Sequence, residues 1–191
     1  MEAGLIFLGV AVVAIIIAIS INNGIIRRRN MVVRAWADVI TYERQKNETL
    51  PALEKEAANY KDHEKSLLAD ITALRSALGK ASRGDVNTDN LAAIEAATSQ
   101  MMAGFNVAVE AYPDLKMADV TMSLMREISE LQDNIAAAIS IFNGNIEAFN
   151  SGIQIFPNSL VNSLMAKEKA YKPFDNQEAT NSLGYSPQRE H

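Results

Sequence analysis

Residues 3–26 constrain this chain more than any other stretch, because none of them carries a charge. A helix of this length, rising about 1.5 Å per residue, spans about 36 Å, enough to cross a hydrocarbon core about 30 Å thick. Cleaved signal peptides begin with basic residues and have a shorter apolar core. Here Glu2 precedes the apolar run, and Arg27, Arg28 and Arg29 follow it. We therefore predict a retained, single-pass membrane anchor.

The basic cluster predicts the orientation of this anchor. Lys and Arg beside a spanning helix favour the cytoplasmic side of the membrane. We expect the N-terminus outside the inner (cytoplasmic) cell membrane and residues 27–191 in the cytoplasm. We divide the chain into an anchor with its basic flank (residues 1–29), a helical domain (residues 30–171) and a flexible tail (residues 172–191).

Composition and charge exclude several classes of function. The net charge is −5 despite the arginine cluster, so a nucleic-acid partner is not expected, because nucleic-acid binding needs a basic face. The chain contains no cysteine, which excludes disulfides and thiolate metal sites. Membrane lipid is the partner that the anchor and its arginines predict.

The apolar residues after the arginines recur every three or four positions, the period of an α-helix. The expected helices are residues 30–78 with a kink at Pro51, residues 91–112, and residues 116–156. Gly79, Pro113 and Pro157 are expected to end them. Short connections between long helices predict an all-α, up-and-down antiparallel bundle.

The expected helices differ in length, so they do not match end to end. The second helix would be about 33 Å long, much shorter than the first and third. Either the first helix bends at Pro51, or a helix end overhangs and buries its apolar stripe against another subunit. The second possibility predicts a homo-oligomer. A short apolar set, Leu160 to Met165, is compatible with core packing, membrane contact or assembly.

Aromatic, amide and acidic residues on these stripes are the candidates for packing or assembly contacts. They are Trp36, Tyr60, Glu64, Tyr112, Phe142, Asn143, Phe149, Asn150 and Phe156. Asn143 and Asn150 share one helical face, and we expect them to hydrogen-bond to a neighbouring helix, with a subunit contact as the alternative. Trp36→Ala and Phe149→Ala are the first substitutions that this interpretation suggests for a test of assembly.

No constellation in the sequence predicts catalysis, a cofactor or a metal. His63 and Glu64 lack the Glu-x-x-His spacing of di-iron bundles, since Tyr60 stands where the glutamate would be. The run Asp85–Asp89 begins like a calcium loop, but Asn90 and Ala96 replace the required Gly and Glu. We expect Thr88 or Asp89 to cap a helix instead.

Several motifs together resemble the LemA family, whose members carry AW-D, L-I-P-N-L, AYPDLK and Y-N…Y-N…F-P. The corresponding segments here are Ala35-Trp36-Ala37-Asp38, Leu50-Pro51-x-Leu53, Ala111 to Lys116, Phe142-Asn143, Phe149-Asn150 and Phe156-Pro157. The resemblance covers roughly Arg28 to Pro157. It implies a bacterial, membrane-anchored helical bundle with no established enzymatic activity. A magnetosome-associated branch is tied to building internal membranes.

The chain departs from the family pattern at polar positions. Ile139 replaces a usual Arg, residues 42–49 differ from the usual polar run, and Phe142 and Phe149 replace the Tyr of each Y-N pair. A polar site shared by the family around these groups would be incomplete here. We predict a non-enzymatic scaffold that self-associates on the membrane. The alternative is a signalling adaptor that binds a cytoplasmic protein.

Overall fold

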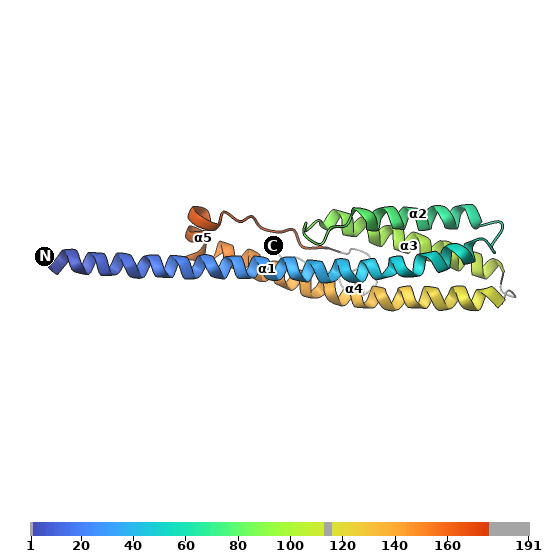
Figure 1. Ribbon diagram of the computed structural model, residues 1–191, viewed down its shortest axis with the longest axis horizontal. Coiled ribbons are helices and arrows are strands. Elements are labelled where there is room, and N and C mark those ends of the chain that lie inside the picture. The colour runs from blue at the N-terminus through green and yellow to red at the C-terminus, as the bar shows by residue number, and fades with distance from the viewer. Residues whose placement is uncertain (1, 113–115, 176–191) are drawn as a thin grey trace, which may run out of the picture.

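The computed structural model describes residues 2–112 and 116–175, and every regular element within them is helical (Figure 1). The elements are α1 (Glu2–Ala57), α2 (Glu64–Lys80), α3 (Thr88–Ala111), α4 (Lys116–Gln154), α5 (Asn158–Val161) and a π-helical turn (Asn162–Ala166). Helices α1 to α4 alternate in direction, so the predicted all-α, up-and-down architecture is confirmed.

The prediction of one helix over residues 30–78 is wrong, because the chain turns back after Ala57. Helix α1 continues through Pro51, and the reversal falls in residues 58–63. There the backbone N–H groups of Asn59, Tyr60 and His63 bond to carbonyls three residues earlier, which tightens the chain into turns. The apolar period continued across this break because α1 and α2 both face the same core.

The predicted apolar stripes are largely confirmed as core. On α1, the turn and α2, the buried members are Trp36, Val39, Leu50, Leu53, Ala57, Tyr60, Leu67, Ile71, Leu74 and Leu78. On α3 and α4 they are Leu91, Ile94, Thr98, Met101, Phe105, Ala108, Ile128, Ile135, Ala138, Phe142 and Phe149. Phe156 is the clear exception at 78% exposed, because α4 ends at Gln154 and Phe156 lies in the turn that leads to α5.

The long pair formed by α1 and α4 is covered differently along its length (Figure 1). The α2–α3 hairpin packs on the part of the pair far from the N-terminus, which we call the distal half. Nearer the N-terminus lies the proximal half, where residues 167–175 run back along the pair as an extended segment, the strap. Neither a bend at Pro51 nor an overhang is therefore needed to reconcile the lengths.

Two local predictions are corrected at the ends of elements. Asn87, rather than Thr88 or Asp89, caps α3, and its side chain accepts from the backbone N–H of Asp89 and Asn90 at 3.1 Å each. Ordered packing extends past the expected start of the tail at residue 172, since Phe174 is only 6% exposed. Residues 176–191, most of the predicted tail, and Pro113 lie outside the described residues.

The first part of α1 stands clear of the bundle. It is long and apolar enough to cross a membrane, and none of its most apolar window is buried within the structure. Burial begins with Ile25, at 1% exposed, where α1 meets the C-terminal elements. The first part of α1 is thus a candidate membrane span whose C-terminal end joins the bundle directly.

Candidate functional site: an asparagine ladder on the strap

Three asparagines hold the strap by its main chain. The side-chain amide of Asn143 donates to the carbonyl oxygen of Phe174 at 2.7 Å and accepts from the N–H of Phe174 at 2.9 Å. Asn150 makes the same pair of bonds with Tyr171, at 2.8 and 2.9 Å. Asn162 repeats the arrangement on Glu168 at 3.0 Å for both bonds. We call these residues the asparagine ladder.

The spacing of the asparagines along α4 matches the spacing of their partners along the strap. Asn143 and Asn150 are seven residues apart on α4, about 10.5 Å along a helix. Tyr171 and Phe174 are three residues apart on an extended segment, about 10 Å at about 3.3 Å per residue. The strap runs antiparallel to α4, so every third strap residue meets an amide. The prediction that these asparagines bond to a neighbouring helix is wrong, because their partner is an extended segment.

Aromatic rings fill the space beneath the ladder. Phe149 packs on Tyr171 with ring centroids 5.4 Å apart, and Phe142 packs on Trp36 at 5.3 Å. The indole N–H of Trp36 donates to the carbonyl oxygen of Ser82 at 2.8 Å, which ties the α2–α3 loop to α1. Trp36 therefore sits where the distal and proximal halves meet.

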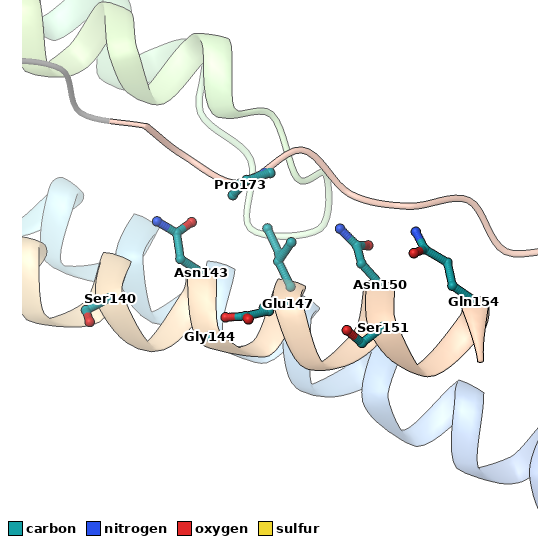
Figure 2. Close-up of a pocket in the computed structure, with 9 residues that line it drawn as sticks. Ser140, Asn143, Gly144, Glu147, Asn150, Ser151, Gln154 and Pro173 are labelled. Atoms are coloured by element: carbon teal, nitrogen blue, oxygen red, sulfur yellow. The ribbon is translucent and has the colours of Figure 1, made fainter. Parts of the chain in front are cut away.

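An open groove runs along α4 beside the strap. Figure 2 shows Asn143 and Asn150 pointing from α4 toward the strap, with Pro173 above the helix. The groove encloses about 550 Å³, and its lining residues are Ser140, Asn143, Gly144, Ile146, Glu147, Asn150, Ser151, Gln154 and Pro173. The hydroxyl, amide and carboxylate side chains of this lining can hydrogen-bond an extended chain.

The distal half contains a fully buried ion pair between two residues of α1. Lys46 Nζ lies 2.6 Å from Glu43 Oε2, and both side chains are fully buried. Lys46 also donates to Thr98 Oγ1 at 3.0 Å and to Gln132 Oε1 at 2.9 Å, which connects α1 to α3 and α4. Among the described residues the Glu43 carboxylate has no hydrogen-bond partner besides Lys46, so its attraction to this one ammonium holds it in place.

Desolvation is the largest cause of the pKa shifts of both residues in this pair. Burial raises the pKa of the Glu43 carboxyl, and the charge of Lys46 opposes that rise. Burial lowers the pKa of the Lys46 ammonium, and the charges of Glu43 and Glu95 oppose that fall. The pair costs desolvation energy, so it is better understood as fixing the register of three helices than as adding stability.

The turn at the far end of the distal half gathers polar and aromatic groups. The buried Tyr60 hydroxyl lies 3.1 Å from Thr121 Oγ1, and its ring packs 6.1 Å from that of Tyr112. The Tyr112 hydroxyl donates to Asp62, and this hydrogen bond raises the pKa of Tyr112. His63 stacks edge-on against Tyr112 at 6.4 Å. These contacts close the bundle end.

The remaining predicted residues occupy the surface. Glu64 is the first residue of α2 and is partly exposed, so it does not interrupt the core. Arg27, Arg28 and Arg29 are exposed at the C-terminal end of the candidate span, and Arg29 pairs with Glu168 at 3.4 Å. Within residues 2–112 and 116–175, no three His, Asp or Glu side chains are grouped as a metal site requires.

The sequence reasoning missed the strap half of the site. Asn162, Tyr171 and Phe174 were not candidates, because an extended segment has no helical period. In addition, the asparagines bond to main-chain groups of the strap, so the side chains of the strap carry no signal of the contact. One signal was available. Asparagine at 143 and 150, each directly after a buried Phe, places two amides beside the core at a seven-residue repeat.

The fold and site define an all-α bundle with an N-terminal candidate membrane span and a C-terminal strap held by asparagines. Comparison with known proteins agrees with this class. The sequence profile of the LemA family matches residues 35–183. The chain belongs to the LemA family, which confirms the resemblance found in its motifs. Protein LemA from Metamycoplasma hominis is 28% identical over 135 residues, covering 71% of this chain and 60% of that protein's length. No solved structure matches the chain.

Proposed function

We propose that this chain is a non-enzymatic, membrane-anchored scaffold that self-associates on the cytoplasmic face of a membrane and contributes to membrane organisation or remodelling. The apolar stretch of α1 serves as the anchor, and Arg27–Arg29 orient it with the bundle inside the cell. Confinement to a membrane plane raises the effective concentration of the bundles, so weak contacts between them suffice for assembly.

The observation that carries self-association is an uncovered groove between α1 and α4. It encloses about 200 Å³ and is lined by Ala35, Asp38, Tyr42, Asn134, Ala137, Ala138 and Ile141. Ile141 is 65% exposed and Tyr42 36%, although they lie midway along the longest helices of the bundle. Exposed apolar side chains beside a groove lined by small alanines favour insertion of a side chain from another copy.

Ile141→Lys tests this face directly. We expect the full-length wild-type protein in detergent to form a uniform assembly by light scattering, and the variant to dissociate, because a cation cannot be buried unpaired. Val107→Lys is the matched control, since Val107 is 55% exposed on α3, away from the groove. A monomeric wild type, or an Ile141→Lys protein that assembles normally, contradicts the proposal.

The buried candidates are unsuitable probes of assembly. Trp36 and Phe149 are 0% exposed within a single chain. Alanine at either position removes core packing worth about 3–5 kcal/mol, so it measures folding rather than association. Ile141, rather than Trp36 or Phe149, is therefore the residue to substitute in a test of assembly.

The second candidate function is a membrane-bound adaptor for a cytoplasmic protein, and the asparagine ladder favours it. Its amides bind the main chain of the strap, so they accept any extended segment that reaches them. A partner segment that displaced the strap would then be held by the same pairs of bonds. Affinity capture from crosslinked membranes separates the two functions: a scaffold returns mainly itself, whereas an adaptor returns a stoichiometric second protein that Asn150→Ala releases.

A further inference from the structure

The chain between α4 and the strap exposes a concentrated set of large apolar side chains. The exposed fractions are Ile155 61%, Phe156 78%, Leu160 54%, Leu164 69% and Met165 48%. Single exposed apolar residues are normal on a protein surface, but a contiguous group of them marks an interaction site. We call residues 155–166, which include α5 and the π-helical turn, the apolar foot.

The apolar foot lies beside the inner end of the candidate membrane span. Helix α5 and the π-helical turn both pack against α1, and Figure 1 shows α5 beside the blue part of α1, away from the distal half. Glu168, just after the foot, pairs with Arg29 at 3.4 Å. The guanidinium of Arg28 fills the space above Gly152, so a Cβ atom at position 152 would clash with it. The foot is therefore level with the point where α1 leaves its apolar stretch.

Positive charge surrounds the apolar foot. Arg27, Arg28 and Arg29 are exposed on α1, and Lys167 and Lys169 are exposed directly after the foot. Glu168 neutralises one of these charges by pairing with Arg29. Exposed apolar side chains next to a surplus of cations are typical of elements that lie in the headgroup layer of a membrane. The same charges would repel each other if two copies met foot to foot.

We propose that the apolar foot is a second membrane contact, which inserts Phe156, Leu160 and Leu164 into the headgroup layer of an anionic bilayer. Lys167 and Lys169 then face lipid phosphates. This inference rests on the proposed anchor, because α1 delivers the foot to that depth. Two attachment points fix the tilt of the bundle, whereas a single helix would leave it free to swing. Asn162 lies in the foot and clamps Glu168, so membrane contact is coupled directly to the first rung of the ladder.

The chain contains no cysteine, so single cysteines can report depth in the full-length protein. Leu164→Cys, Ile15→Cys and Val107→Cys, each carrying an environment-sensitive dye, are reconstituted in vesicles of phosphatidylcholine and phosphatidylglycerol. Ile15 reports the anchor, and Val107 is an exposed apolar residue of the distal half, 55% exposed. We expect spin-labelled lipid to quench the dyes at positions 15 and 164, and aqueous iodide to quench the dye at position 107.

Each outcome has a distinct meaning. Iodide quenching at position 164 with lipid quenching at position 15 overturns the membrane contact of the foot and leaves the anchor intact. Iodide quenching at position 15 overturns the anchor itself. A dye at position 164 shielded from both quenchers overturns lipid docking and assigns the foot to a protein contact. Replacing both lysines, in a Lys167→Gln, Lys169→Gln background, should reduce lipid quenching at position 164. This reduction should be larger in vesicles that contain phosphatidylglycerol than in vesicles of phosphatidylcholine alone.

Discussion

The distal and proximal halves of the bundle solve the same packing problem by different means. In the distal half, four helices bury apolar stripes against one another, and a buried ion pair links three of them. In the proximal half, two helices are covered by a strap whose main chain is bound by asparagine side chains. A helix supplies its own backbone hydrogen bonds, whereas an extended segment must find partners for every buried N–H and C=O group.

This difference predicts unequal stability along the molecule. Releasing the strap breaks a few hydrogen bonds and exposes Phe174 and Tyr171, whereas opening the distal half exposes the main core. Regions with few buried apolar contacts open at lower free energy than the core does. The proximal half should thus open at a lower free energy than the distal half.

The largest expected effect is in the distal half. Glu43→Ala leaves Lys46 charged, buried and without its counter-ion, and breaking a buried pair in this way costs about 3–5 kcal/mol. The double variant Glu43→Met, Lys46→Met should recover most of that loss, because apolar residues of similar volume replace a desolvated pair. Urea unfolding followed by Trp36 fluorescence measures the free energy, with the exposed Glu48→Ala as control. A fully tolerated single variant would show that the pair does not organise this half.

A pH profile sharpens this prediction. Burial raises the pKa of Glu43, so the folded state holds this proton at higher pH than the unfolded chain does. The resulting stabilisation is fully present below the ordinary value of about 4.3 and is lost as pH rises through the raised pKa. Lys46→Met removes the cation that opposes the rise in the pKa of Glu43. The free energy of unfolding that this variant loses relative to wild type should therefore shrink on acidification, by about 1.4 kcal/mol for each unit by which the pKa of Glu43 differs between the two proteins. Adding Glu43→Gln should abolish that pH dependence, and its persistence would assign the effect to another group.

A smaller and local effect is expected in the proximal half. Asn150→Ala removes both bonds to Tyr171, at a cost of about 1–3 kcal/mol in strap docking. Hydrogen exchange across residues 168–175 should accelerate while the distal core stays protected. Asn145→Ala is the matched control, because Asn145 donates to Ile141 within its own helix. Equal exchange in the two variants would show that the ladder does not hold the strap.

The same contrast explains what could be predicted from the sequence. The stripes on α3 and α4 followed from their period, because burial of apolar side chains leaves a pattern in the residues themselves. The turn at residues 58–63 could not be predicted because the buried Tyr60 continues the helical spacing of apolar residues through the segment where the backbone reverses. The strap could not be predicted because Asn143 and Asn150 hydrogen-bond to main-chain N–H and C=O groups, which nearly every residue possesses. Phe156 was assigned to the α4 stripe because it continues the helical period, although the helix ends before it.

The smallest effect is expected at the far end of the distal half, where the hydrogen bond between Tyr112 and Asp62 tests whether this end, like the strap, depends on polar contacts. The Asp62 carboxylate accepts from the Tyr112 hydroxyl and raises the pKa of Tyr112, so the contact contributes below pH about 10 and is lost as pH rises through the raised value. Asp62→Ala should return Tyr112 to its ordinary pKa, measured as the tyrosinate absorbance that Tyr112→Phe removes. Lys61→Ala, next to Asp62 in the same turn, is the control. An unchanged titration in Asp62→Ala would mean that ring packing with Tyr60 and His63 closes this end, and the polar closure would then be confined to the strap.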